Sequence, residues 1–136
     1  MLEKWPLQIL LLTFLTGLLG LEREAKRKPA GIGTHILVAL SVFTFFYIGE
    51  KFVGDLPRII SSVIIGIGFI GGGVIVKHPE KIGEEVIGIT TAATLWFAVA
   101  ISLLVCVEEY LLAMVLTLLA LGVLKARIPL KEKLHH

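Results

Sequence analysis

The sequence has 136 residues, of which 56% are hydrophobic and 18% charged, and its formal net charge is +2. This length indicates one domain, and the small net charge argues against an extended basic surface for nucleic acid. A mean hydropathy of +0.90, with a charged fraction below the roughly 25% of soluble domains, indicates an integral membrane protein.

Five apolar segments follow one another along the chain, at residues 5–21, 32–48, 56–76, 89–107 and 110–124. A helix crosses a bilayer core of about 30 Å with about 20 residues, and about 17 is a practical minimum. The third and fourth segments meet this length, the first two are marginal and the fifth is short. We predict an all-α, polytopic transmembrane bundle of about five helices over residues 1–127, followed by a polar C-terminal tail at residues 128–136.

The basic residues predict how the bundle is oriented, because cytoplasmic loops carry an excess of Lys and Arg. With the N-terminus outside, ten basic residues fall on the inner side and three on the outer side. The ten are Arg23, Lys26, Arg27, Lys28, Lys77, Lys81, Lys125, Arg127, Lys131 and Lys133, and the three are Lys4, Lys51 and Arg58. We therefore predict an outer N-terminus and a cytoplasmic C-terminus.

Charged residues of both signs stand where the first segment leaves the apolar core. Glu22, Arg23 and Glu24 are the first of them, and Thr34 and His35 follow at the mouth of the second segment. One interpretation is a basic anchor with local ion pairs. The other places Glu22 or Arg23 inside the bundle, where ionisable groups are usually kept for function.

Two further sets of polar residues are candidates. Asp55 and Arg58 flank the start of the third segment, either as a helix cap or as a functional ion pair. Thr90 and Thr91 open the fourth segment, where hydroxylated residues suit a tight contact between helices.

The third segment contains a run of glycines that reads G-x-G-x-x-G. It lacks the strand and the later acidic residue that a dinucleotide site requires. Small residues four apart instead let helix backbones approach closely, within or between subunits. The alternative is an unwound helix whose free carbonyls line a cavity. The predicted packing residues are Ser62, Gly66, Gly68, Gly71, Gly72 and Gly73.

The sequence contains no recognisable catalytic motif. It has no H-E-x-x-H pair, no nucleophile with a plausible base, and no phosphate-binding loop that ends in Lys-Ser or Lys-Thr. We predict that the protein is not an enzyme and holds no cofactor, with Mg²⁺ as the one ion to be considered.

Taken in order, these motifs resemble the MgtC/SapB family of prokaryotic membrane proteins. The matching stretches are residues 20–24, 28–32, 34–35, 66–75 and 88–96, with Asp55 and Arg58 between them. Gly33 and Ile87 depart from the family, which usually has Arg at both positions. The resemblance implies a five-helix domain in the prokaryotic cytoplasmic membrane, associated with magnesium homeostasis and, in some pathogens, with survival inside host cells.

Three functional hypotheses follow from the resemblance and the residues. The first, which we favour, is a regulator that binds other membrane proteins through its helices. The second is a Mg²⁺ transporter or channel, for which carboxylates are available only near the helix ends. The third is a homo-oligomeric membrane scaffold. The expected partners are the lipid bilayer, further copies of the chain and other membrane proteins, and not nucleic acid.

Overall fold

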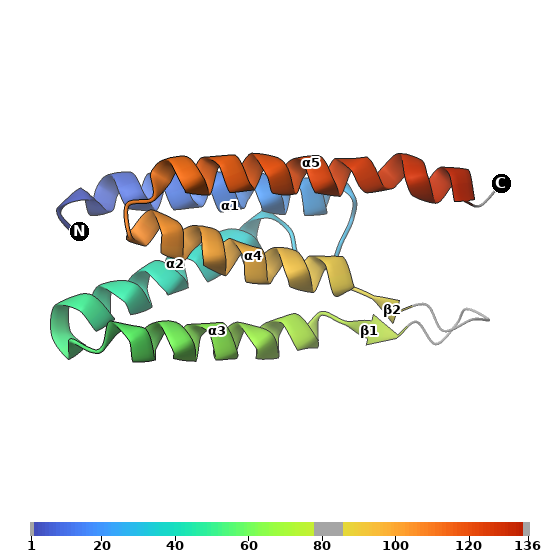
Figure 1. Ribbon diagram of the computed structural model, residues 1–136. Helices are drawn as coiled ribbons and strands as arrows, with labels where there is room; N and C mark the ends of the chain where they lie inside the picture. Colours follow the sequence, from blue (N-terminus) through green and yellow to red (C-terminus); the bar gives the residue numbers. More distant parts are fainter. Residues whose placement is uncertain (1, 78–85, 135–136) are drawn as a thin grey trace.

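The computed structural model describes residues 2–77 and 86–134, with side chains for residues 3–75 and 86–126. Five α-helices form an antiparallel bundle, and α1 begins at the opposite end of it from the end of α5 (Figure 1). The helices are α1 (Trp5–Ala25), α2 (Ile32–Ile48), α3 (Leu56–Gly73), α4 (Ile89–Cys106) and α5 (Tyr110–Leu134). The short elements are the 3₁₀ turn η1 (Leu2–Lys4), the π-helical turn η2 (Gly49–Val53), and the antiparallel strands β1 (Val76–Lys77) and β2 (Val86–Ile87).

The predicted transmembrane bundle is confirmed. Within the described parts of the chain, four helices are long and apolar enough to cross a membrane, and α5 has a shorter apolar part at Tyr110–Ala126. The orientation in the membrane stays a prediction. Lys81 and the rest of the loop at residues 78–85 lie outside the described residues, as do the side chains of the predicted tail.

The structure differs from the prediction in several details, and helix α1 ends at Ala25 and α3 at Gly73, where the predicted segments ended at residues 21 and 76. The second span continues through η2 to Val53, because the π-helical turn follows α2 without a break. Helix α5 runs on to Leu134 and takes in most of the predicted tail, since Lys, Glu and Leu all favour a helix. The short β1–β2 hairpin was not predicted, because two-residue strands leave no pattern in the sequence.

Two glycines end or begin elements with a backbone that other residues rarely adopt. Gly54 has φ +71° and closes η2. Gly88 has φ +99° and precedes α4, and a Cβ added there would overlap the Val74 carbonyl. These two positions set the directions in which the chain enters α3 and α4.

Helix α4 lies at the centre of the bundle and α3 at its edge. Half of the most apolar window of α4 (50%) is buried inside the protein, against 11% for α3. Helix α3 lies on the side of the bundle away from α1 and α5 (Figure 1). Most of the α3 surface is therefore left for lipid or for another protein.

Helices α1 and α2 meet at a close backbone contact. A Cβ on Gly20 would lie 2.6 Å from Ile32 Cα and 2.8 Å from the Gly31 carbonyl oxygen. Both neighbours are backbone atoms and cannot turn aside as a side chain can. Only glycine therefore allows this approach, which brings the end of α1 against the start of α2.

We expect Gly20→Ala to push α1 and α2 apart and to lower the free energy of unfolding by about 1–3 kcal/mol, as overpacking does in other cores. Gly122→Ala is the matched control, because nothing lies within 4 Å of a Cβ at that position. Thermal melting of both purified variants in one detergent measures the difference. Equal melting temperatures would contradict the close contact.

Candidate functional site

Three charged residues at the end of α1 form a buried ion-pair cluster. The Glu22 carboxylate accepts a hydrogen bond from Arg23 Nη1 at 3.3 Å, and its other oxygen pairs with Lys26 Nζ. The side chains of Glu22 and Arg23 are 7% and 4% exposed. Because isolated charges are costly to bury, each charge here depends on its opposite partner.

The cluster also connects α1 to α4 and α5. Arg23 Nη2 lies 3.5 Å from Thr91 Oγ1 of α4, and Thr91 is fully buried. Lys26 Nζ donates to the Leu124 carbonyl of α5 at 3.0 Å. One short stretch of α1 therefore fixes the positions of two later helices.

His35 is fully buried and joins α2 to α4. Its Nδ1 lies 2.8 Å from the Gly31 carbonyl oxygen, and its Nε2 lies 3.1 Å from Thr94 Oγ1. A carbonyl oxygen can only accept, so Nδ1 carries the proton. In the neutral ring Nε2 is then an acceptor, and the Thr94 hydroxyl can donate to it. The same hydroxyl lies 2.8 Å from the Thr91 carbonyl oxygen, so the two acceptors compete for its one hydrogen.

Glu24 has a different role from Glu22. Its Oε2 accepts a hydrogen bond from the Ile32 amide at 3.2 Å, at the first residue of α2. Gly31, the residue before α2, has no side chain that could make this bond. Glu24 therefore caps α2 from α1, and a negative charge suits a helix N-terminus.

Asp55 and Arg58 lie at the opposite end of the bundle from this cluster. The Asp55 carboxylate accepts a hydrogen bond from the Arg58 amide at 3.3 Å, which makes it the cap of α3. Both side chains are exposed. The contact that the structure shows is therefore the capping one, between the Asp55 side chain and the backbone.

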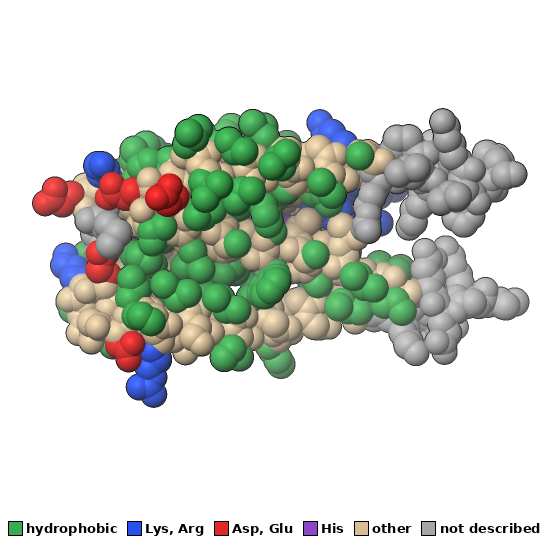
Figure 2. Space-filling view, viewed as in Figure 1, with side chains coloured by type: hydrophobic (Ala, Val, Ile, Leu, Met, Phe, Trp, Pro, Cys, Tyr) green, Lys and Arg blue, Asp and Glu red, His purple; other side chains and the backbone are tan. Residues whose placement is uncertain are grey.

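An ion pair at the same end of the bundle connects Lys4, just before α1, to the turn between α4 and α5. Lys4 Nζ lies 3.2 Å from Glu108 Oε2. The hydrogen bond to Glu108 and its negative charge raise the pKa of Lys4 above its ordinary value. Acidic side chains gather at this end of the molecule (Figure 2).

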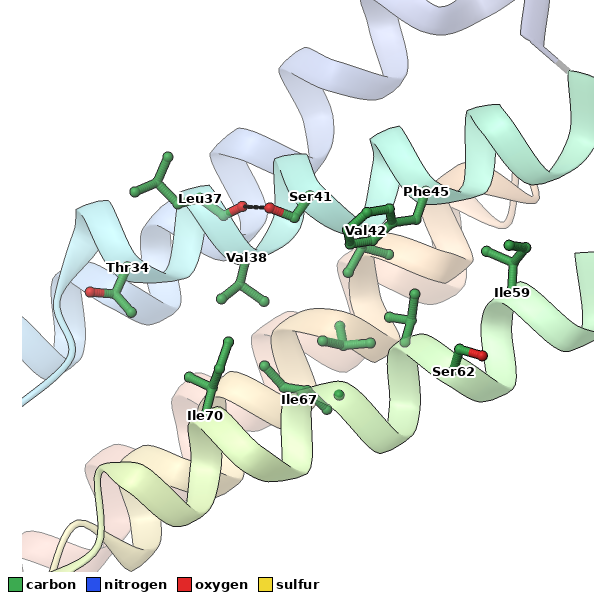
Figure 3. Close-up of a pocket in the computed structure, with 13 residues that line it drawn as sticks. Thr34, Leu37, Val38, Ser41, Val42, Phe45, Ile59, Ser62, Ile67 and Ile70 are labelled. Carbon is green, nitrogen blue, oxygen red and sulfur yellow. Dashed lines mark hydrogen bonds between the residues drawn. The ribbon is translucent and has the colours of Figure 1, made fainter. Parts of the chain in front are cut away.

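An apolar groove of about 620 Å³ separates α2 from α3. Side chains from both helices point into it, with Thr34 near one end and Ser62 near the other (Figure 3). Gly66 also lines it, and no atom lies within 4 Å of a Cβ at Gly66, Gly68, Gly72 or Gly73. Of the predicted glycine contacts, the structure shows one inside the protein, where a Cβ on Gly71 would lie 3.7 Å from Ala92 Cβ.

The sequence profile of the MgtC family matches residues 9–133. The chain belongs to the MgtC family. It is 39% identical over 92 residues to Protein MgtC of Brucella abortus (strain 2308), which covers 66% of the chain and 37% of that protein. It is 35% identical over 127 residues to Protein MgtC of Salmonella typhimurium (strain 14028s / SGSC 2262), covering 93% of the chain and 52% of that protein.

A third relative is the Escherichia coli (strain K12) protein named "Putative magnesium transporter YhiD". It is 29% identical over 136 residues, covering 90% of the chain and 61% of that protein. The chain thus spans between 37% and 61% of the length of these curated relatives. No solved structure matches the chain.

In this MgtC-family bundle the structure brings together five of the predicted site residues, namely Glu22, Arg23, Glu24, His35 and Thr91. It separates four others, since Thr34 lines the α2–α3 groove, Thr90 lines a groove between α4 and α5, and Asp55 and Arg58 lie at the far end. Lys26 and Thr94 complete the cluster and were not among the predicted site residues. The spacing of Thr94 from Thr91 was the available signal, because residues three apart share a helix face.

The cluster is not arranged as a metal site. Over the described residues, no group of three or more His, Cys, Asp or Glu side chains is placed to hold a metal ion. The Glu22 oxygens face Arg23 and Lys26, and Glu24 faces a backbone amide. These contacts hold helices together and give the site the chemistry of a structural polar network.

A double-mutant cycle tests the contact between His35 and Thr94. We expect His35→Leu and Thr94→Val each to destabilise the protein, and the double variant to be less destabilised than the sum. The expected coupling is about 0.6–1.7 kcal/mol, the range found for hydrogen bonds between membrane helices. Unfolding of the four proteins in mixed detergent micelles measures it.

Thr44→Val serves as the control for this cycle, because Thr44 is exposed and its bond among the described residues is to the Leu40 carbonyl of its own helix. Combined with His35→Leu, it should give no coupling. A His35–Thr94 coupling that is no larger than the control would contradict the bond.

Proposed function

We propose that this chain is a non-enzymatic, multi-pass protein of the prokaryotic cytoplasmic membrane that acts in magnesium homeostasis by binding other membrane proteins. Membership of the MgtC family supports the membrane assignment. The name of the Escherichia coli relative supports the connection with magnesium. The groove between α2 and α3 supports the binding role, and it is the observation on which the proposal rests.

This groove has the features of a surface that receives a transmembrane helix. Small residues let two helices approach closely, and hydroxyls supply hydrogen bonds in lipid. Gly66 lies on the α3 side of the groove and Ser41 on the α2 side, and the whole of α3 is little buried by its own protein. A helix from another protein could therefore pack here without displacing any contact of the bundle.

The buried charges favour regulation over transport by the bundle itself. A cation that passed between α1 and α4 would meet the Arg23 guanidinium, and like charges repel strongly where the dielectric constant is low. Mg²⁺ is usually held through one or two carboxylates. Glu22 is already neutralised by two cations, and Glu24 is engaged as a helix cap.

Transport is the second candidate, because the name of the Escherichia coli relative is "Putative magnesium transporter YhiD". Measurement of Mg²⁺ influx into liposomes that contain only the purified chain separates the two. We expect influx no greater than in protein-free liposomes. Circular dichroism of the same liposomes confirms that the helices are intact.

Flux that is clear in the native chain and is lost in Glu22→Ala or Asp55→Ala would overturn the regulator proposal. Lys51→Ala is the control variant, because Lys51 is exposed and the bond that the described residues show for it is to Tyr47, four residues before it. Flux above the protein-free level that is unchanged in all three variants would also count against the regulator proposal, and would indicate a path that does not use Glu22 or Asp55.

A second prediction concerns the groove. We expect Gly66→Leu to abolish growth at low external Mg²⁺ in cells that depend on this chain, because the leucine would fill the groove, while the protein still accumulates in the membrane. Gly122→Leu should be without effect, since nothing lies within 4 Å of a Cβ there and Gly122 does not line the groove.

A photoreactive residue in place of Ser62 identifies the occupant in the same cells. A crosslink to a different membrane protein, lost in Gly66→Leu, supports regulation. A crosslinked product with twice the mass of the chain would instead indicate a homo-oligomer. Normal growth of cells that carry Gly66→Leu would show that the groove is not needed for the function.

A further inference from the structure

A second groove, of about 560 Å³, runs between α4 and α5. Apolar side chains line most of it, among them Phe97 of α4, Leu116 of α5 and Leu19 of α1. Hydrophobic side chains cover this part of the molecule (Figure 2). In a membrane such a surface faces lipid.

The polar groups of this groove lie toward one end. Thr90 and Thr94 come from the first two turns of α4, whereas the lining residues further from this end, Phe97 of α4 and Leu116 of α5, are apolar. The α2–α3 groove differs, because hydroxyls occur along its whole length, from Thr34 through Ser41 to Ser62. The α4–α5 groove thus changes from polar to apolar along one direction, as a phospholipid does.

Cations lie at the polar end of the α4–α5 groove. Lys26 donates to the carbonyl of Leu124, a residue that lines the groove, and this bond holds the α1–α2 loop at the groove mouth. Lys125, the next residue of α5, is exposed, as are Arg27 and Lys28 of the loop. The N-terminus of α4 lies at the same end and has no side-chain cap, so its amides add positive charge.

The charge balance differs between the two ends of the bundle. Among the described side chains, the groove end carries five basic and two acidic residues, namely Arg23, Lys26, Arg27, Lys28 and Lys125 with Glu22 and Glu24. The opposite end carries three basic and five acidic residues, namely Lys4, Lys51 and Arg58 with Glu3, Glu50, Asp55, Glu108 and Glu109. Of these two sets of described side chains, the one at the groove end has the net positive charge that would attract an anion.

We propose that the α4–α5 groove binds an acyl chain of an anionic phospholipid whose phosphate is held by Lys125 and the cations of the α1–α2 loop. The apolar side chains of the groove contact the hydrocarbon chain, and the basic residues at its end bind the headgroup. A basic pocket between membrane helices is a recognised way to select anionic lipids. This site is separate from the α2–α3 groove and does not depend on the proposed regulatory role.

Native mass spectrometry of the purified chain in a neutral detergent tests the proposal. The probes are dioleoyl phosphatidylglycerol and dioleoyl phosphatidylcholine, which have the same acyl chains and differ in headgroup charge. We expect phosphatidylglycerol to bind at least several times more tightly. Glycerol 3-phosphate, added as a competitor, should not displace it, because it lacks the acyl chain.

Matched variants assign the two parts of the site. Lys125→Gln should reduce the preference for phosphatidylglycerol about fivefold, the effect of one lysine near a charged lipid surface. Lys51→Gln removes an exposed charge at the opposite end and should leave the preference unchanged. Ala93→Phe should fill the groove and weaken binding, whereas Ala100→Phe, on an exposed part of α4 outside the groove, should not.

Melting temperatures show which variants remain folded, and the Lys125→Gln result stands even where Ala93→Phe is unstable. Equal binding of the two lipids would overturn the proposal. An equal loss of the preference for phosphatidylglycerol in Lys51→Gln and Lys125→Gln would also overturn it, because the preference would then depend on the net charge of the protein and not on this groove. Displacement by glycerol 3-phosphate would show a phosphate site in place of a lipid site.

Discussion

The Glu22 carboxylate, held between the Arg23 guanidinium and the Lys26 ammonium, is the interaction on which the arrangement of the helices depends. Charges inside a bundle require partners, because their desolvation is costly. Here the partners reach further, since Arg23 contacts Thr91 of α4 and Lys26 contacts the Leu124 carbonyl of α5. If α1 rotated or slid, the ion pair would move with it, because all three charges lie within one turn of the chain, but the contacts with α4 and α5 would be lost together.

The sequence predicted the helices because their apolar lengths match a bilayer, and it pointed to Glu22 and Arg23 because charges at the end of an apolar run are unusual. It did not predict that Glu24 caps α2, or that Lys26 reaches α5. Both contacts depend on how the helices cross, and Gly20 sets that crossing through a backbone contact that no residue pattern reveals. Glu22 and Glu24 look equivalent in the sequence, but in the fold Glu22 forms ion pairs and Glu24 caps α2.

The glycines show the same limit of sequence reasoning. A glycine allows close packing, but its partner is set by the fold. Gly20, outside the glycine run, makes the closest approach between helices, whereas most of the run meets nothing within the chain. The run lies on α3, the least buried of the four long spans, so it leaves a surface open and does not close the core. This placement is why packing within the subunit was only partly predictable.

The charges at the basic end divide into two groups with different consequences. Arg23 is buried and Lys26 is partly buried, and both pair with Glu22, so they fix helix geometry and contribute less net charge than exposed cations do. Arg27, Lys28 and Lys125 are exposed, and they supply the excess that predicts a cytoplasmic location for this end. The cytoplasmic leaflet is also the one whose surface is negatively charged. The exposed cations that would orient the chain are therefore the ones that would meet an anionic headgroup, while the buried ones keep the groove in place beside them.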